Sequence, residues 1–130
     1  MGERADWTEA VQRFATAKKP GKYRSEPVQV EGIRFDSKLE ADRYRELKLL
    51  RQSGEVLYFL RQVPFDAATR VVYRADFLVV WNRMGTAGEN VTVEDCKGFV
   101  TPTARVKIAA VQDRYGIKIQ ILTRKEVRRA

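Results

Sequence analysis

Four charged residues stand at positions where the surrounding sequence predicts apolar side chains. Glu40 lies in a helical pattern, Asp76 in a long apolar run, and Asp95 and Lys97 in a shorter strand-like segment. A buried carboxylate is costly unless it is paired, protonated or bound to a metal ion. An all-oxygen carboxylate site suits Mg²⁺ or Mn²⁺, which bind through carboxylates and phosphate oxygens. These residues are therefore the first candidates for a catalytic site.

The composition excludes several other chemistries. The chain has 130 residues, no histidine and a single cysteine, Cys96. Ser-His-Asp and Cys-His catalytic arrangements and histidine-ligated zinc sites are therefore impossible. An intramolecular disulfide is impossible as well. Catalysis by this chain has to use carboxylates, lysines, hydroxyl groups and hard metal ions.

The positive charge is unevenly placed along the chain. Lysine and arginine number 25 against 17 acidic residues, which gives a formal net charge of +8. Such a surplus favours a polyanionic partner, since each neutralised phosphate releases counterions. Ordinary solubility charge explains it equally well. The segment 18–24 contains four basic residues that we take as candidate DNA contacts: Lys18, Lys19, Lys22 and Arg24.

The hydrophobic pattern predicts one α/β or α+β domain with a mixed central sheet and flanking helices, in the order α-β-β-β-α-β. We expect a basic N-terminal appendage over 1–26, either a helix or a disordered arm, a core domain over 27–122 and a basic tail over 123–130. A small hairpin is predicted over 28–35. The predicted helices span 37–52 and 101–115, and the predicted strands span 56–65, 71–81, 91–97 and 117–121.

Helical periodicity places Glu40 within the apolar arc of the first core helix, whereas Asp42 and Glu46 fall outside it. Ser37 and Glu40 also fit a capping box, in which the acid serves only the first turn. The two roles are compatible.

Strand periodicity gives the other three residues their directions. Asp76 interrupts a run that is apolar on both faces, where aspartate is disfavoured, and a salt bridge with Arg74 is the alternative explanation. Asp95 and Lys97 share one face of their strand, while Glu94 points to the other. A surface ion pair between Asp95 and Lys97 is again the simpler alternative.

Together these segments resemble the PD-(D/E)XK nuclease superfamily. Within it, the chain is similar to the small phage and archaeal Holliday junction resolvases and related phage endonucleases, over about residues 32–122. The resemblance rests on the segments 35–41, Asp76-Phe77 and Asp95-Cys96-Lys97-Gly98. Alanine precedes Asp76 where the name motif has proline. The extra acid Glu94 leaves open which acid binds metal, although strand alternation favours Asp95.

The resemblance implies a restriction-endonuclease-like core that hydrolyses DNA phosphodiesters with Mg²⁺, or Mn²⁺ as a substitute. Asp76, Asp95 and the backbone carbonyl of Cys96 would hold the ion, and Glu40 would reach a second ion or a metal-bound water. Lys97 would orient or help deprotonate the attacking water. A resolvase would be a two-fold homodimer that makes paired symmetric nicks in four-way junctions.

Two further polar residues are weaker DNA-binding candidates. Gln62 is polar within an apolar strand, and Lys107 lies on the edge of a helical apolar stripe, where a snorkelling surface lysine is the simpler reading. Two other functions stay open. One is a phage endonuclease of the same fold that acts on flaps, nicks or duplex DNA, and the other is a non-catalytic basic nucleic-acid-binding module.

The longest apolar run, residues 77–81, is far shorter than the roughly 20 residues of a membrane span. The opening residues are charged and lack the apolar region of a signal peptide. We therefore expect no membrane association and a cytoplasmic protein, in the host cytoplasm if it is phage-encoded.

Overall fold

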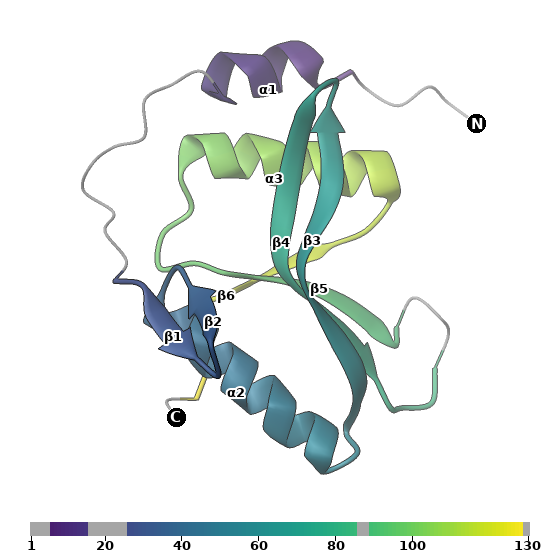
Figure 1. Ribbon diagram of the computed structural model, residues 1–130. Helices are drawn as coiled ribbons and strands as arrows, with labels where there is room; N and C mark the ends of the chain where they lie inside the picture. Colours follow the sequence, from purple (N-terminus) through teal and green to yellow (C-terminus); the bar gives the residue numbers. More distant parts are fainter. Residues whose placement is uncertain (1–5, 16–25, 86–88, 129–130) are drawn as a thin grey trace.

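The computed structural model describes residues 6–15, 26–85 and 89–128 (Figure 1). The candidate DNA contacts Lys18, Lys19, Lys22 and Arg24 lie outside these residues. Hydrophobic periodicity locates most elements to within a few residues of the predicted bounds. In chain order they are α1 (Thr8–Ala15), β1 (Val28–Val30), β2 (Ile33–Phe35), α2 (Lys38–Gln52), β3 (Val56–Ala68), β4 (Val71–Trp81), β5 (Val91–Cys96), α3 (Pro102–Tyr115) and β6 (Ile119–Leu122).

The central sheet has four strands in the order β3-β4-β5-β6. Its first three strands are antiparallel, and β6 joins β5 in parallel after the crossover through α3. This mixed sheet with flanking helices confirms the α+β class expected from the sequence. β1 and β2 form a separate hairpin, whose turn residues Glu31 and Gly32 both have positive φ, +54° and +79°. Such turns match the twist of a two-residue hairpin.

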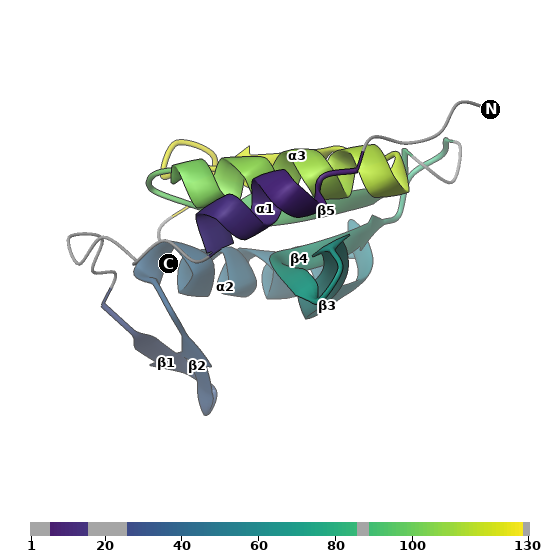
Figure 2. The ribbon, with the colours of Figure 1, turned by 90° about the horizontal axis from the view of Figure 1, so that it is seen from above.

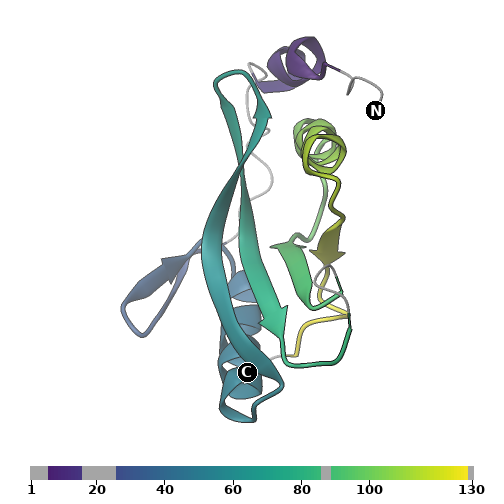
Figure 3. The same cartoon turned by 90° about the vertical axis from the view of Figure 1, so that its right-hand side faces the viewer.

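Two hydrophobic clusters hold the helices to the sheet. One packs α2 against Phe77 and Val79 of β4, and the other packs α1 and α3 against Tyr73 and Ala75 of the same strand. Ala75 and Phe77 are two residues apart and so point to the same face of β4, yet they belong to different clusters. β4 therefore contacts both helical layers, and the change of layer falls between Ala75 and Phe77. Figures 2 and 3 show the long β3–β4 hairpin extending from α2 to α1 and α3.

Local sequence signals fix the ends of both core helices. Ser37 caps α2, with its Oγ accepting a hydrogen bond from the Glu40 N–H at 3.1 Å. Thr101 caps α3, which has Pro102 in its first turn and ends at Gly116 in the left-handed conformation, φ +65°. Proline at the start and glycine at the end are typical of helix boundaries. None of the helices in the described ranges has the length and apolar character needed to span a membrane.

The packed core is larger than the range 27–122 expected from the sequence. Val11 of α1 is fully buried, and the indole Nε1 of Trp7 donates to Asp113 Oδ2 at 3.0 Å. Residues 6–15 are therefore packed on α3. At the other end, Val127 is buried against α2, so the segment after β6 also completes the core.

Two details of the secondary structure also differ from expectation. β3 continues to Ala68, three residues past the predicted end, because it stays paired with β4 up to Val71. Asp42 lies outside the apolar arc of α2 yet is only 1% exposed. Arg45 of the same helix and Arg124 of the C-terminal segment cover it and pair with its carboxylate.

Candidate active site

A groove of about 840 Å³ opens where the start of α2 meets the middle of β3 and β4 and the end of β5. All four predicted catalytic residues line it, together with Gln62 and Cys96. Lys107 of α3 does not line it. The complete lining is Asp36, Ser37, Leu39, Glu40, Gln62, Arg74, Asp76, Asp95, Cys96, Lys97, Gly98, Phe99, Thr101 and Arg124.

The groove begins where β4 and β5 separate. Their pairing runs from Val80 opposite Val91 to Phe77 opposite Glu94 and stops there, so that Asp76 and Asp95 occupy the next position. Asp76 Oδ2 accepts a hydrogen bond from the Cys96 backbone N–H at 2.8 Å. The carboxylate thus takes the place of a carbonyl in the ladder.

Asp76 has no ion pair with Arg74 among the contacts of the described residues, and Arg74 is exposed. The salt-bridge explanation of Asp76 is therefore unsupported. Burial raises the pKa of Asp76 to about 9, with further contributions from the hydrogen bond and charge of Asp95 and from the charge of Glu40. In the metal-free site these effects favour the protonated form of Asp76.

Asp95 is buried, and besides Asp76 it has two polar neighbours. The Tyr73 hydroxyl donates a hydrogen bond to Asp95 Oδ2, and the Lys97 Nζ lies 3.5 Å from the same oxygen. Burial and the negative charge of Asp95 raise the pKa of Tyr73 far above its ordinary value, so the phenol stays a donor. The sequence did not single out Tyr73, because a tyrosine in a strand is typical of an ordinary core residue.

Glu40 lies in the first turn of α2 and lines the groove. Its backbone N–H donates to the capping Ser37 Oγ at 3.1 Å, while its carboxylate Oε1 accepts a hydrogen bond from Gln62 Nε2 at 3.2 Å. Burial raises the pKa of Glu40, and the charges of Asp36 and Asp95 add to this effect while Arg61 opposes it. Ser37 thus caps the helix as expected, while the Glu40 carboxylate lies in the groove with Gln62 as its hydrogen-bond partner.

Gln62 has an unusual backbone for a strand interior. It lies opposite Asp76 and has φ +52°, a left-handed conformation that non-glycine residues adopt at a cost of about 1–3 kcal/mol. Its amide reaches the Glu40 carboxylate from this position. Periodicity shows that Gln62 is polar but carries no signal for the backbone conformation.

Glu94 faces the opposite side of β5 from Asp95. Arg43 of α2 binds it through two buried hydrogen bonds, Nε to Oε1 at 2.8 Å and Nη2 to Oε2 at 2.6 Å, and also bonds Glu46. Glu94 is thus engaged in a structural ion pair and does not line the groove. Of the two adjacent acids, Asp95 is the one within it.

Cys96 lies at the groove through its backbone. Its side chain is buried in the cluster under α2, and burial raises the pKa of the thiol, as do the charges of Asp76 and Glu94. A thiol with a raised pKa is a poor nucleophile and a poor metal ligand.

The donor set fits a hard divalent cation better than any other cofactor. Asp76 and Asp95 interact directly, and all their donor atoms are oxygens. Across the described ranges, no three acidic or cysteine side chains come close enough to enclose a metal ion. Mg²⁺ does not need such an enclosure, because it commonly binds through one or two carboxylates and retains several waters.

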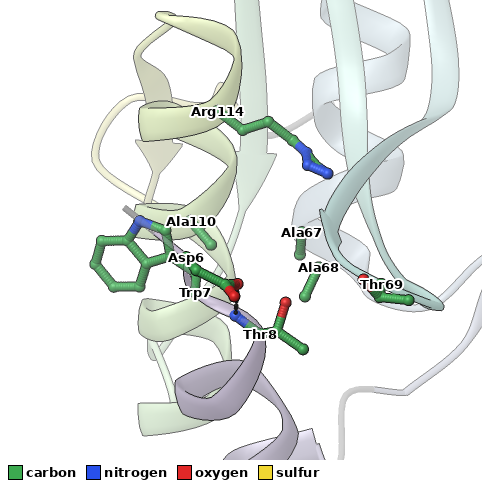
Figure 4. A pocket seen from close by; sticks show the side chains of 8 residues that line it. All are labelled: Asp6, Trp7, Thr8, Ala67, Ala68, Thr69, Ala110 and Arg114. Atoms are coloured by element: carbon green, nitrogen blue, oxygen red, sulfur yellow. Dashed lines mark hydrogen bonds between the residues drawn. The ribbon is translucent and has the colours of Figure 1, made fainter. Parts of the chain in front are cut away.

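A second, smaller hollow of about 290 Å³ lies at the other end of the domain, between α1, the β3–β4 turn and α3 (Figure 4). Ala110 of α3 lines one side and Ala67 and Ala68 of β3 the opposite side, and Asp6 and Arg114 also line it. The Asp6 carboxylate is already bonded to the Thr8 N–H at 2.9 Å. This hollow therefore lacks the convergent acids of the groove.

Comparison with known proteins gives a family but no activity. The family model described as "Protein of unknown function (DUF1064)" matches residues 20–126. That range covers the groove and every groove residue discussed above. No curated protein matches the chain.

Proposed function

The chain belongs to the DUF1064 family, and from the chemistry of its groove we propose that it is a Mg²⁺-dependent DNA endonuclease of the PD-(D/E)XK type. The proposed substrate is branched DNA, with the four-way junction first, as in a Holliday junction resolvase. Hydrolysis of a backbone phosphodiester is the proposed reaction.

One observation carries this proposal: two carboxylates, Asp76 and Asp95, lie side by side where two strands separate, and Lys97 lies beside them. Buried like charges destabilise a fold, and such perturbed acids gather at functional sites. The structural acids of this chain behave differently, since Glu94 and Asp42 are each matched by arginine. Asp76 has a backbone N–H and a second acid as neighbours instead.

Asp76 and Asp95, together with the backbone carbonyl of Cys96, are the groups proposed to hold the ion. When bound, Mg²⁺ supplies Lewis-acid polarisation of the phosphate and a water of lowered pKa. Glu40, which lies across the groove on α2, is proposed to bind a water of the metal shell.

The remaining groove residues are assigned to substrate and water. Lys97, whose Nζ is 3.5 Å from Asp95 Oδ2, is proposed to orient the attacking water and to stabilise negative charge on the phosphate. Tyr73 holds the Asp95 carboxylate by its hydrogen bond, and Gln62 holds Glu40. Asp95 and Glu40 thus each have a neutral side-chain donor beside them that fixes their position.

A resolvase has to cut two opposing strands of the junction, which requires two such grooves. We therefore propose a two-fold homodimer as the active form. The net charge of +8 supports binding to a polyanion without base recognition.

The deciding experiment is cleavage of a labelled synthetic four-way junction beside matched flap and linear duplex DNA, with Mg²⁺ and with EDTA. Paired symmetric nicks in the junction, seen only with metal, are the expected result. Metal-dependent cutting of all three substrates alike would retain the nuclease and remove the resolvase. Tight binding without any cutting in Mg²⁺ or Mn²⁺ would favour the non-catalytic binding module. Asp95→Asn should abolish cleavage and leave DNA binding intact.

A further inference from the structure

Arg124 lies on the wall of the groove, in the segment that follows β6. Its Nη1 donates to Asp42 Oδ2 at 2.8 Å, and its side chain is 35% exposed. Arg124 therefore borders the groove and is partly exposed, while its guanidinium is held by the Asp42 carboxylate.

Asp42 is a buried anchor for this arginine. Its side chain is completely buried on α2, and its other oxygen, Oδ1, binds Arg45 Nη1 at 3.2 Å. Two arginines thus share one carboxylate, so that the three groups carry one net positive charge. A charge pair formed with a buried partner is more rigid than a surface ion pair, which solvent and side-chain entropy weaken.

The other cations of the groove are placed differently. Lys97 lies beside Asp95, and Arg74 is exposed, with no ion pair to an acid among the contacts of the described residues. Only Arg124 combines a fixed guanidinium with access to the groove. A guanidinium carries five N–H donors in a planar fork, and the bond to Asp42 occupies one of them. That fork matches the geometry of a phosphate.

We propose that Arg124 binds a phosphate of the DNA backbone in the groove, and that Asp42 acts as a positioning residue for its guanidinium. This inference rests on the proposed function for the identity of the ligand. The contact involves the DNA backbone and no base edge, so it adds affinity equally for any sequence. It also adds about one phosphate to the number neutralised, which sets the salt dependence of binding.

The test is DNA binding by the full chain, measured by fluorescence anisotropy over a series of NaCl concentrations. A labelled four-way junction and a linear duplex are used, in EDTA and with Ca²⁺. Arg124→Gln removes the charge and leaves a shorter, neutral polar side chain at the same position. We expect it to weaken binding about tenfold and to make the slope of log Kd against log salt shallower by about one.

Arg45→Gln is the matched control. It removes an arginine from the same carboxylate, but Arg45 does not line the groove. Its affinity and salt slope should equal those of the wild type. Arg124→Lys keeps the charge without the planar fork and should recover the salt slope, with affinity between that of Arg124→Gln and the wild type. Asp42→Asn should weaken binding while leaving the slope nearly unchanged.

The inference is overturned if Arg124→Gln binds DNA as tightly as the wild type, or loses no more affinity than Arg45→Gln. Failure of the wild type to bind DNA at all overturns it too. The nuclease proposal fails separately: DNA that binds through Arg124 but is never nicked with Mg²⁺ removes the enzyme and leaves the phosphate contact standing. If the wild type nicks DNA with Mg²⁺ but Arg124→Gln binds DNA unchanged, the nuclease proposal stands and the phosphate contact of Arg124 is removed.

Discussion

The Asp76 carboxylate accepts a hydrogen bond from the Cys96 backbone N–H at 2.8 Å, at the point where pairing between β4 and β5 ends. A backbone group of β5 thereby fixes a side chain of β4 at the point where the strands separate. The opening between the strands and the placement of Asp76 are therefore one feature. It also brings Asp76 next to Asp95, the neighbour that, after burial, contributes most to raising its pKa.

The metal-free protein should lose stability through Asp76 as the pH rises. Below the unfolded-state pKa of 3.8 the folded and unfolded states both hold the proton, so the ionisation of Asp76 does not change the free energy of unfolding. Between this value and about 9 the folded state keeps the proton that the unfolded state releases, so the free energy of unfolding falls. Asp76→Asn should therefore stabilise the metal-free protein at pH 7 by on the order of 1–3 kcal/mol.

Urea unfolding in EDTA at pH 4 and pH 7 measures this effect as the difference between wild type and variant. Ion pairs elsewhere in the protein cancel in that difference. Asp66→Asn, which changes an exposed aspartate of β3, is the control and should show no pH-dependent difference. An Asp76→Asn protein that is equally stabilised at both pH values, or destabilised at pH 7, would contradict the raised pKa.

Glu94 and Asp95 are adjacent, and their substitutions should have opposite consequences. Glu94→Gln leaves the buried Arg43 without its main partner, which typically costs about 3–5 kcal/mol. Asp95→Asn removes a charge from beside Asp76, and it should change stability much less while abolishing cleavage. Urea melts and nicking assays on both variants test this.

Lys48→Gln is the control for the loss of an ion pair. Lys48 pairs with Glu31 on an exposed part of the surface, where solvent screens the interaction. Its unfolding midpoint should match that of the wild type. If Glu94→Gln melts like Lys48→Gln, the Arg43–Glu94 pair is not a major contribution to stability.

Much of this arrangement could be read from the sequence because it depends on periodicity. Strand alternation put Asp95 and Glu94 on opposite faces, and the structure has Asp95 in the groove and Glu94 on Arg43. Ser37 signalled the start of α2 because a cap is a local hydrogen bond. Elements and side-chain directions of this kind need no knowledge of distant contacts.

The rest depends on tertiary contacts that no local pattern records. Asp42 reads as a solvent-facing acid, whereas in the fold Arg45 and the returning chain at Arg124 cover it. Tyr73 reads as a core residue until β5 places Asp95 against its hydroxyl. Gln62 gives no sign of its left-handed backbone, because glutamine has no preference for that region.

The Tyr73 hydroxyl should matter for metal use more than for folding. Tyr73→Phe keeps the buried ring but removes the donor to Asp95. Loss of a group that orients a metal ligand commonly costs 10–100-fold in metal affinity or activity. The Mg²⁺ concentration for half-maximal nicking should therefore rise about tenfold or more, whereas stability should fall by only about 1 kcal/mol. Tyr58→Phe, at an exposed position of β3, should change neither, and an unchanged Mg²⁺ requirement in Tyr73→Phe would refute the role.

Mg²⁺ should raise the melting temperature of the wild type, because an ion that binds only the folded state stabilises it by mass action. Asp95→Asn should lose this shift, since it removes a proposed ligand. Glu94→Gln should retain it, because Glu94 lies on the other face of β5. Equal Mg²⁺ shifts in all three proteins would indicate non-specific ion binding elsewhere.

In most strand positions an alanine variant is more stable than a glycine variant, and at position 62 we expect the opposite. At its φ of +52° alanine is strained and glycine is not. Both substitutions lose the hydrogen bond to Glu40 equally, so their difference isolates the backbone. Gln62→Gly should therefore be more stable than Gln62→Ala by about 1 kcal/mol in urea unfolding.

Leu60 provides the matched comparison, because it is exposed on the same strand and is not among the residues with positive φ. At this position the free energy of unfolding of Leu60→Ala should be about 0.5–1 kcal/mol higher than that of Leu60→Gly, which is the ordinary order for a strand. Should alanine also be the more stable at position 62, the left-handed backbone would not be a property of the folded protein in solution. If the order does reverse, both variants should still lose nicking activity, since neither can hold Glu40. That joint result would show that the strained backbone at Gln62 has a functional role. The fold would then tolerate the strain because this backbone conformation lets the glutamine side chain contact Glu40.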